Sequence, residues 1–167
     1  MAQHSRIARS LATALVVIFQ LSVTSTRALA QVEEVKITVE GMTCNLCAAG
    51  LERSLRRVEG VAAVKVVLAS QVATIRLKPG VAVAPALLRA AVESAGQRLR
   101  VVEVRLRGTL QRDEGRYQLR PAGVTQTFAV RDDVKLEPLA GTSVRLRGRV
   151  VSSGAAAVEL ELVDIEP

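Results

Sequence analysis

The sequence predicts an α+β protein in which two helices cover one face of an antiparallel sheet, followed by a small all-β barrel. Two observations predict this class. Between residues 35 and 104, alternating apolar runs and helically spaced apolar residues succeed one another in the order strand, helix, strand, strand, helix, strand. From about residue 105 helical spacing ceases, and short alternating runs are separated by turn sequences. We therefore expect a ferredoxin-like βαββαβ sandwich over residues 31–104 and an OB-like barrel over residues 105–167.

The first half of the sandwich begins with alternation over residues 35–40, which predicts a half-buried strand. A loop that starts at Gly41 ends this strand. Leu51, Leu55 and Val58 then recur at helical spacing, and Gly60 ends the predicted helix. A loop carrying two cysteines thus leads directly into a helix.

The second half reads as a hairpin, a helix and a strand. Alternation over residues 61–68 and 72–78 predicts the hairpin. Pro85 suits the first turn of a helix, and Gly96 suits the left-handed residue that follows it. The last strand covers residues 99 to about 104, and it is expected to run without a linker into the barrel.

Five strands are expected in the barrel, at residues 104–110, 117–120, 127–130, 143–151 and 158–165. The string Val-Arg-Leu-Arg-Gly occurs at 104–108 and again at 144–148, but the residues around the two copies do not match. We interpret both copies as barrel strands, with Gly108 and Gly148 at bends or bulges. Tyr117 and Phe128 are expected in the barrel core, and the adjacent Asp132 and Asp133 in a solvated turn.

Residues 1–30 read as a cleaved secretory signal peptide. Arg6 and Arg9 precede an apolar stretch, and Ala28-Leu29-Ala30 supplies the small residues of a cleavage site. The apolar run is interrupted before it reaches the roughly 20 residues that span a bilayer, so we expect no stable membrane anchor after cleavage. The predicted localisation is periplasmic or secreted.

The net charge of +7 resembles that of a nucleic-acid-binding protein, but its distribution argues against that class. Three of the basic residues lie in the signal peptide. Residues 31–100 hold ten basic and six acidic side chains, and residues 101–167 hold ten of each. Aromatic residues make up 2% of the chain, which leaves few groups for stacking on bases. We expect no nucleic-acid partner.

The chemistry of the mature chain is expected to depend on two cysteines. The only histidine is His4, so Cys-His nucleophile pairs and histidine-type zinc sites are excluded. Cys44 and Cys47 lie three positions apart at a helix N-terminus, where the helix dipole favours thiolates. Two thiolates suit a soft ion that accepts two sulfur ligands, which indicates Cu(I), Ag(I) or Hg(II).

The segment from about Val35 to Val104 resembles the heavy-metal-associated domain of copper chaperones, metal-transporting P-type ATPases and periplasmic mercury-binding proteins. The residues that carry the resemblance are Gly41-Met42-Thr43-Cys44-x-x-Cys47, Leu51, Leu55, Val58-Glu59-Gly60-Val61 and Glu93-Ser94-Ala95-Gly96. The resemblance implies that Cys44 and Cys47 bind the metal, that Met42 anchors the loop in the core, and that Thr43 supports the loop. Gln97 departs from the tyrosine that many bacterial members place there.

The function predicted from these residues is that of an exported, non-enzymatic carrier of Cu(I) or Hg(II). It would pass the ion by ligand exchange to a metal transporter or another carrier protein. Three interpretations are open for the arginines at positions 53, 56 and 57. Arg53, Arg56 and Arg57 form a docking face for an acidic partner, or they compensate the charge of the metal complex. The third interpretation is an ordinary solvated face with a Glu52–Arg56 pair. Three alternatives stay open: a thiol-disulfide oxidoreductase, an envelope interaction protein with a metal-sensing module, and a structural disulfide.

Overall fold

The computed structural model describes residues 32–131, 135–153 and 157–166. The predicted signal peptide, residues 1–30, and the acidic pair Asp132 and Asp133 lie outside the described residues. Within the described part of the chain, neither helix has the length and apolar character needed to cross a bilayer.

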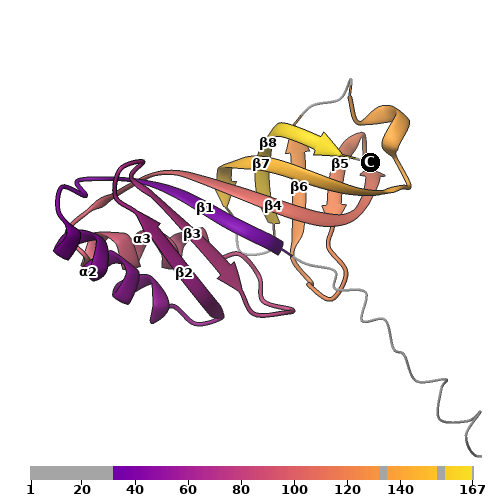
Figure 1. Cartoon of the computed structure of the whole chain (residues 1–167). Helices are drawn as coiled ribbons and strands as arrows, with labels where there is room; N and C mark the ends of the chain where they lie inside the picture. The colour runs from indigo at the N-terminus through magenta and orange to yellow at the C-terminus, as the bar shows by residue number, and fades with distance from the viewer. Residues whose placement is uncertain (1–31, 132–134, 154–156, 167) are drawn as a thin grey trace, which may run out of the picture.

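The first module has the predicted βαββαβ order. Its elements are β1 (Val32–Glu40), α2 (Asn45–Arg56), β2 (Val61–Val67), β3 (Val72–Leu77), α3 (Pro85–Ser94) and the first part of β4 (Arg98–Asp113). The strands lie in the order β2-β3-β1-β4, and every neighbouring pair is antiparallel. Figure 1 shows both helices beside this sheet. The arrangement confirms the ferredoxin-like prediction for this part of the chain.

Burial follows the predicted periodicities. Ile37 on the central strand and Leu51 and Leu55 on α2 are completely buried. The two helices are joined by the Ser54 hydroxyl, which donates to the carbonyl oxygen of Ala91 at 2.8 Å. The sequence placed Val58 in the first helix, but α2 ends at Arg56. Val58 instead closes a turn, where its N–H donates to the Leu55 carbonyl oxygen.

Strand β4 belongs to both modules. It is continuous over 16 residues, so the predicted strands at 99–104 and 104–110 are one strand. The expected boundary between residues 104 and 105 falls inside it. Figure 1 shows β4 running from the helical layer into the barrel. The predicted absence of a linker is therefore confirmed, because one hydrogen-bonded strand joins the two modules.

The second part of the chain closes into a ring of five strands. Besides β4 it contains β5 (Arg116–Arg120), β6 (Thr127–Arg131), β7 (Ser143–Ser153) and β8 (Ala157–Glu166). Pairing runs β4-β5-β6-β8-β7 and returns from β7 to β4; β6 and β8 are parallel, and the other pairs are antiparallel. A short 3-10 helix, η1 (Glu137–Leu139), was not predicted. Tyr117 and Phe128 are 2% and 0% exposed, which confirms that they belong to the core.

The two modules are also held together outside β4. The loop before α3 carries Val83, which is 2% exposed. Its N–H donates to Gln126 Oε1 at 2.9 Å, and its carbonyl oxygen accepts from Gln126 Nε2 at 2.8 Å. One glutamine side chain from the barrel thus satisfies both backbone groups of a buried residue in the first module.

Replacing this glutamine tests the contact. We expect Gln126→Met to lower the free energy of unfolding by about 1–3 kcal/mol, because both buried polar groups of Val83 lose their partner. Urea unfolding followed by circular dichroism measures the change. Gln118→Met is the control, since Gln118 lies half-buried on β5. Equal losses in the two variants would contradict the role of Gln126.

Candidate metal centre

The cysteine loop is shaped by a glycine and closed by the start of a helix. Gly41 follows β1 with φ +96°, a left-handed conformation that favours glycine. Cys44 is the N-cap of α2, and its Sγ accepts the backbone N–H of Cys47 at 3.0 Å. The turn after β1 therefore delivers both cysteines to the positive end of a twelve-residue helix.

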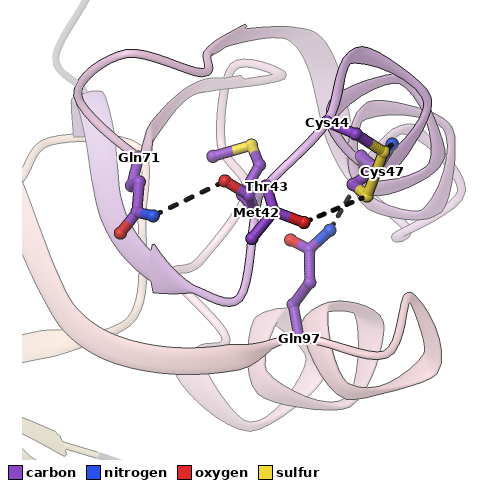
Figure 2. The surroundings of a disulfide bond; sticks show 6 residues. All are labelled: Met42, Thr43, Cys44, Cys47, Gln71 and Gln97. Carbon is purple, nitrogen blue, oxygen red and sulfur yellow. Dashed lines mark hydrogen bonds between the residues drawn. A yellow bond between two sulfur atoms is a disulfide. The ribbon is translucent and has the colours of Figure 1, made fainter.

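Cys44 and Cys47 are joined by a disulfide in the structure, with their Cα atoms 5.1 Å apart. Cys44 is exposed and Cys47 is half-buried. Figure 2 shows the two sulfur atoms together at the end of the helix. The backbone therefore holds the cysteines near enough for both sulfurs to contact one ion once the bond is reduced. Among the described residues, no group of three or more His, Cys, Asp and Glu side chains is placed to hold a metal.

The other loop residues lie where they can support the cysteines. Met42 is 2% exposed, and its sulfur points away from the disulfide (Figure 2). Its carbonyl oxygen accepts from Gln71 Nε2 at 3.5 Å. Thr43 Oγ1 lies 4.0 Å from Cys47 Sγ. The buried Met42 side chain and the hydrogen bond from Gln71 therefore both hold the loop in place. The contact with Gln71 was not predicted from the sequence.

Gln97 is a second residue that supports the loop through a contact that was not predicted from the sequence. It is 4% exposed, and its Nε2 donates to the carbonyl oxygen of Cys47 at 3.1 Å (Figure 2). Its Oε1 is buried and has no hydrogen-bond partner among the described residues. The only signal in the sequence was its position directly after Gly96. A buried amide with one free acceptor therefore lies against the first turn of α2.

Arg53 and Arg56 lie in the last turn of α2, and Arg57 is its C-cap, so these arginines lie toward the opposite end of the helix from the cysteines. Arg56 pairs with Glu52 at 2.6 Å, as expected for an ordinary solvated face. Arg53 and Arg57 are exposed and make no ion pair with any described residue. At 1.5 Å per residue, Arg56 lies about 18 Å along the helix from Cys44. This exceeds the Debye length of about 8 Å in physiological salt, so Arg56 and Arg57 do not compensate the charge of a complex on Cys44.

The residue before Cys47 is an exposed leucine. Leu46 is 85% exposed, the largest exposure among the large hydrophobic residues of the described chain. It lies in the first turn of α2, two residues after the exposed Cys44. Leu46 is thus an exposed apolar side chain in the same helical turn as the disulfide.

Fold and site together define a class: a ferredoxin-like module that presents a Cys-x-x-Cys pair at the start of its first helix. Residues 36–98 match the family model described as heavy-metal-associated domain. This part of the chain belongs to that family, as the sequence motif indicated.

Relatives and solved structures match part of the chain. Copper-transporting ATPase 2 of Rattus norvegicus is 46% identical over 50 residues, which are 30% of this chain and 3% of the relative. Copper-transporting ATPase 1 of Rhizobium meliloti (strain 1021) is 45% identical over 62 residues, 37% of this chain and 7% of the relative. The chain therefore spans only a small fraction of these relatives.

Two solved structures illustrate the likeness. A CopZ metallochaperone is 25% identical, with a TM-score of 0.38, and the match covers 41% of this chain and all of that one. Oxidized MerP from Ralstonia metallidurans CH34 is 26% identical, with a TM-score of 0.37, over 41% of this chain and 93% of that one.

Proposed function

We propose that the protein is an exported carrier of a soft heavy-metal ion, Cu(I) or Hg(II), which it holds between Cys44 and Cys47. The observation that carries this proposal is the placement of two cysteines, and no third ligand among the described residues, at the N-terminus of α2. The 45–46% identity to copper-transporting ATPases over 50 to 62 residues supports the choice of a soft ion. Two sulfur ligands suit Cu(I) and Hg(II) better than zinc, which takes four.

Metal capture begins from the reduced loop in this proposal. The disulfide must first accept two electrons and two protons from a reductant, since sulfurs bonded to each other are not thiolate ligands. Each thiol then loses its proton as it binds the ion. The helix dipole and the N–H of Cys47, which already points at Cys44 Sγ, favour the negative sulfur.

Transfer follows from the exposure of the site. A thiolate of a second protein can approach the ion on the side of Cys44 and replace one sulfur at a time, so the ion need not be released into water. Leu46 supplies apolar contact at this surface, while Arg53 and Arg57 leave positive charge for an acidic partner. The proposed partner is a metal transporter or another metal carrier.

Export of the protein, directed by residues 1–30, is consistent with the disulfide form of the cysteine pair. Disulfides persist in oxidising compartments such as the bacterial periplasm. A signal peptide and a Cys44–Cys47 disulfide are therefore mutually consistent. The proposed location is the periplasm or the exterior, with no membrane anchor after cleavage.

For residues 105–167 we propose a barrel of the OB type. Its support is the closed ring of five strands, in which the third and fifth strands, β6 and β8, are parallel. We propose a binding role for it, because the OB type of barrel is one whose strand face and loops bind ligands. Because β4 is shared between the modules, this binding role is tested on the whole protein rather than on residues 105–167 alone.

Metal titration tests the proposed function directly. The reduced protein is expected to bind Cu(I) or Hg(II) with one-to-one stoichiometry, and the oxidised protein is expected to bind neither. Absorbance of the metal–thiolate bond, together with competition by a chelator, gives stoichiometry and affinity. The proposal fails if the reduced protein binds neither ion.

The disulfide favours one alternative, a thiol-disulfide oxidoreductase. In that case Cys44 would attack a substrate disulfide, forming a mixed disulfide that Cys47 then resolves. Turnover of a model disulfide by catalytic amounts of protein, with a thiol reductant supplied to reduce the Cys44–Cys47 disulfide in each cycle and without any metal effect, would establish this alternative in place of metal carriage.

The support given by Gln97 leads to a further expectation. Gln97→Leu removes the hydrogen bond to Cys47 and also the buried unpartnered Oε1. These effects oppose each other, so we expect the unfolding free energy of the oxidised protein to change by less than about 1 kcal/mol. Metal affinity is expected to fall several-fold, about 1 kcal/mol in binding free energy, because the first turn of α2 is less well held.

Parallel chemical unfolding and chelator competition separate these two effects. Leu87, which is 52% exposed on α3, provides the control variant Leu87→Gln. Equal metal affinity in wild type and Gln97→Leu would show that Gln97 serves packing alone.

A further inference from the structure

The two copies of the string Val-Arg-Leu-Arg-Gly lie far from the metal site and pair with each other. In the β4–β7 ladder, Leu106 lies opposite Leu146, Arg105 opposite Arg147 and Arg107 opposite Arg145. Two identical strings paired antiparallel about a central residue are related by a local two-fold axis. Both leucines are completely buried, so alternation places all four arginines on the outer face.

Like charges directly opposite each other on neighbouring strands destabilise a sheet. The pair Arg107–Arg145 is neutralised by protein groups. Glu33 on β1 lies 3.4 Å from Arg107 and 3.2 Å from Arg145, and Glu166 on β8 lies 3.1 Å from Arg145. Carboxylates therefore offset the repulsion in this row of the sheet.

The second pair, Arg105–Arg147, is not offset in the same way. Arg105 makes no ion pair within 4.0 Å in the described part of the chain, although Glu34 lies opposite it on β1. Glu34 instead contacts Lys36 at 3.3 Å. Arg147 has one contact with Asp164, at 3.6 Å, and its Nε is buried without a hydrogen-bond partner among the described residues.

A small hollow of about 80 Å³ lies at this pair, in which only Arg147 has a carboxylate partner among the described residues. It is lined by Arg105, Arg145, Leu146, Arg147, Asp164 and Glu166. Guanidinium groups present planar N–H donors that suit the oxygens of carboxylate, sulfate and phosphate. A hollow of this size suits a small ion rather than a peptide or a nucleotide.

We propose that this hollow binds a small oxyanion of the phosphate or sulfate type, held by Arg105 and Arg147. The anion would accept N–H groups at the accessible ends of the two opposed guanidiniums and neutralise their charge. Because Asp164 and Glu166 also line the hollow, the expected affinity is in the millimolar range, about 4 kcal/mol at 1 mM. The site lies where β1, β4, β7 and β8 run side by side, so a bound anion would also stiffen the junction between the modules.

Inorganic phosphate is the probe for the test. The thermal unfolding midpoint of the purified protein is measured against phosphate and against chloride at equal ionic strength. Phosphate is expected to raise the midpoint saturably, and chloride is not. NMR signals of arginine side-chain N–H groups are expected to shift with the same midpoint concentration.

Substitutions locate the effect. Arg105→Gln and Arg147→Gln are each expected to weaken phosphate binding about tenfold or more, the loss of one charge-assisted hydrogen bond. Arg105→Gln is also expected to raise the unfolding midpoint without phosphate, because it removes the repulsion. Arg120→Gln changes the net charge equally at an exposed position on β5 and is expected to keep full binding.

Two results would overturn the proposal. One is an equal response to phosphate and chloride, which would show general screening. The other is an equal loss of binding in Arg120→Gln, which would show that net charge alone matters. If Arg147→Gln does not fold, Arg105→Lys takes its place, since it keeps the charge and removes the planar donor pair.

Discussion

Cys44→Ser and Cys47→Ser are each expected to lower the affinity for Cu(I) by at least about a hundredfold, or about 3 kcal/mol. A soft ion prefers thiolate to a hydroxyl, and one remaining cysteine supplies one ligand where the ion requires two. The described residues offer no nearby third ligand to replace the lost one. Chelator competition on the reduced proteins measures the change.

Asn45→Ser is the matched control for these substitutions. Asn45 is exposed and lies between the cysteines, so it introduces the same hydroxyl into the same turn. We expect its affinity to equal that of wild type. One-to-one binding of unchanged affinity in both cysteine variants would show that the ion is held elsewhere in the protein.

Gly108→Ala is expected to have the largest effect on folding. A Cβ at this position would lie 2.5 Å from the carbonyl oxygen of Arg120 and 2.9 Å from the nitrogen of Pro121. Both are backbone atoms, so β4 and β5 would have to separate where they pair. Overpacking of this kind costs about 1–3 kcal/mol, and we expect the upper end because no flexible side chain can give way.

Gly50→Ala is the control, and it is expected to change the free energy of unfolding in the opposite direction. Gly50 is inside α2, and a Cβ added there would meet nothing within 4 Å. Alanine in a helix interior is expected to stabilise the protein by about 0.5–1 kcal/mol over glycine. Urea unfolding at one temperature compares the two variants. A Gly108→Ala protein as stable as wild type would show that the barrel strands separate without cost.

The local sequence pattern was sufficient to predict the helices and strands of the first module, because these elements are short and several are bounded by glycines. Glycines at 41, 60 and 96 have φ values of +96°, +82° and +76°, and each lies at the end of an element. The cysteine spacing also placed both thiols at one helix N-terminus, since three residues span less than one turn. The family resemblance and the candidate ligands therefore followed from neighbouring residues.

Local pattern was less informative where strands are shared or paired over long distances. No turn residue marks a break in β4, so a boundary between two strands was placed inside it. The repeated string at 104–108 and 144–148 was interpreted correctly as two strands, but its pairing with itself was missed. Gly148 lies at a register shift in the β7–β8 ladder, as expected, whereas Gly108 marks a close approach of backbones.

The sequence by itself determined the order of elements in the first module, the short strands of the second, and the two thiols on which the proposed chemistry depends. Only the tertiary structure decided which distant residues meet: Gln97 against Cys47, Gln126 against Val83, and Arg105 against Arg147. The physical reason is that periodicity records which face of an element is buried, over a few residues. Contacts between residues 40 or more positions apart depend on how strands pair and close, which no local spacing specifies.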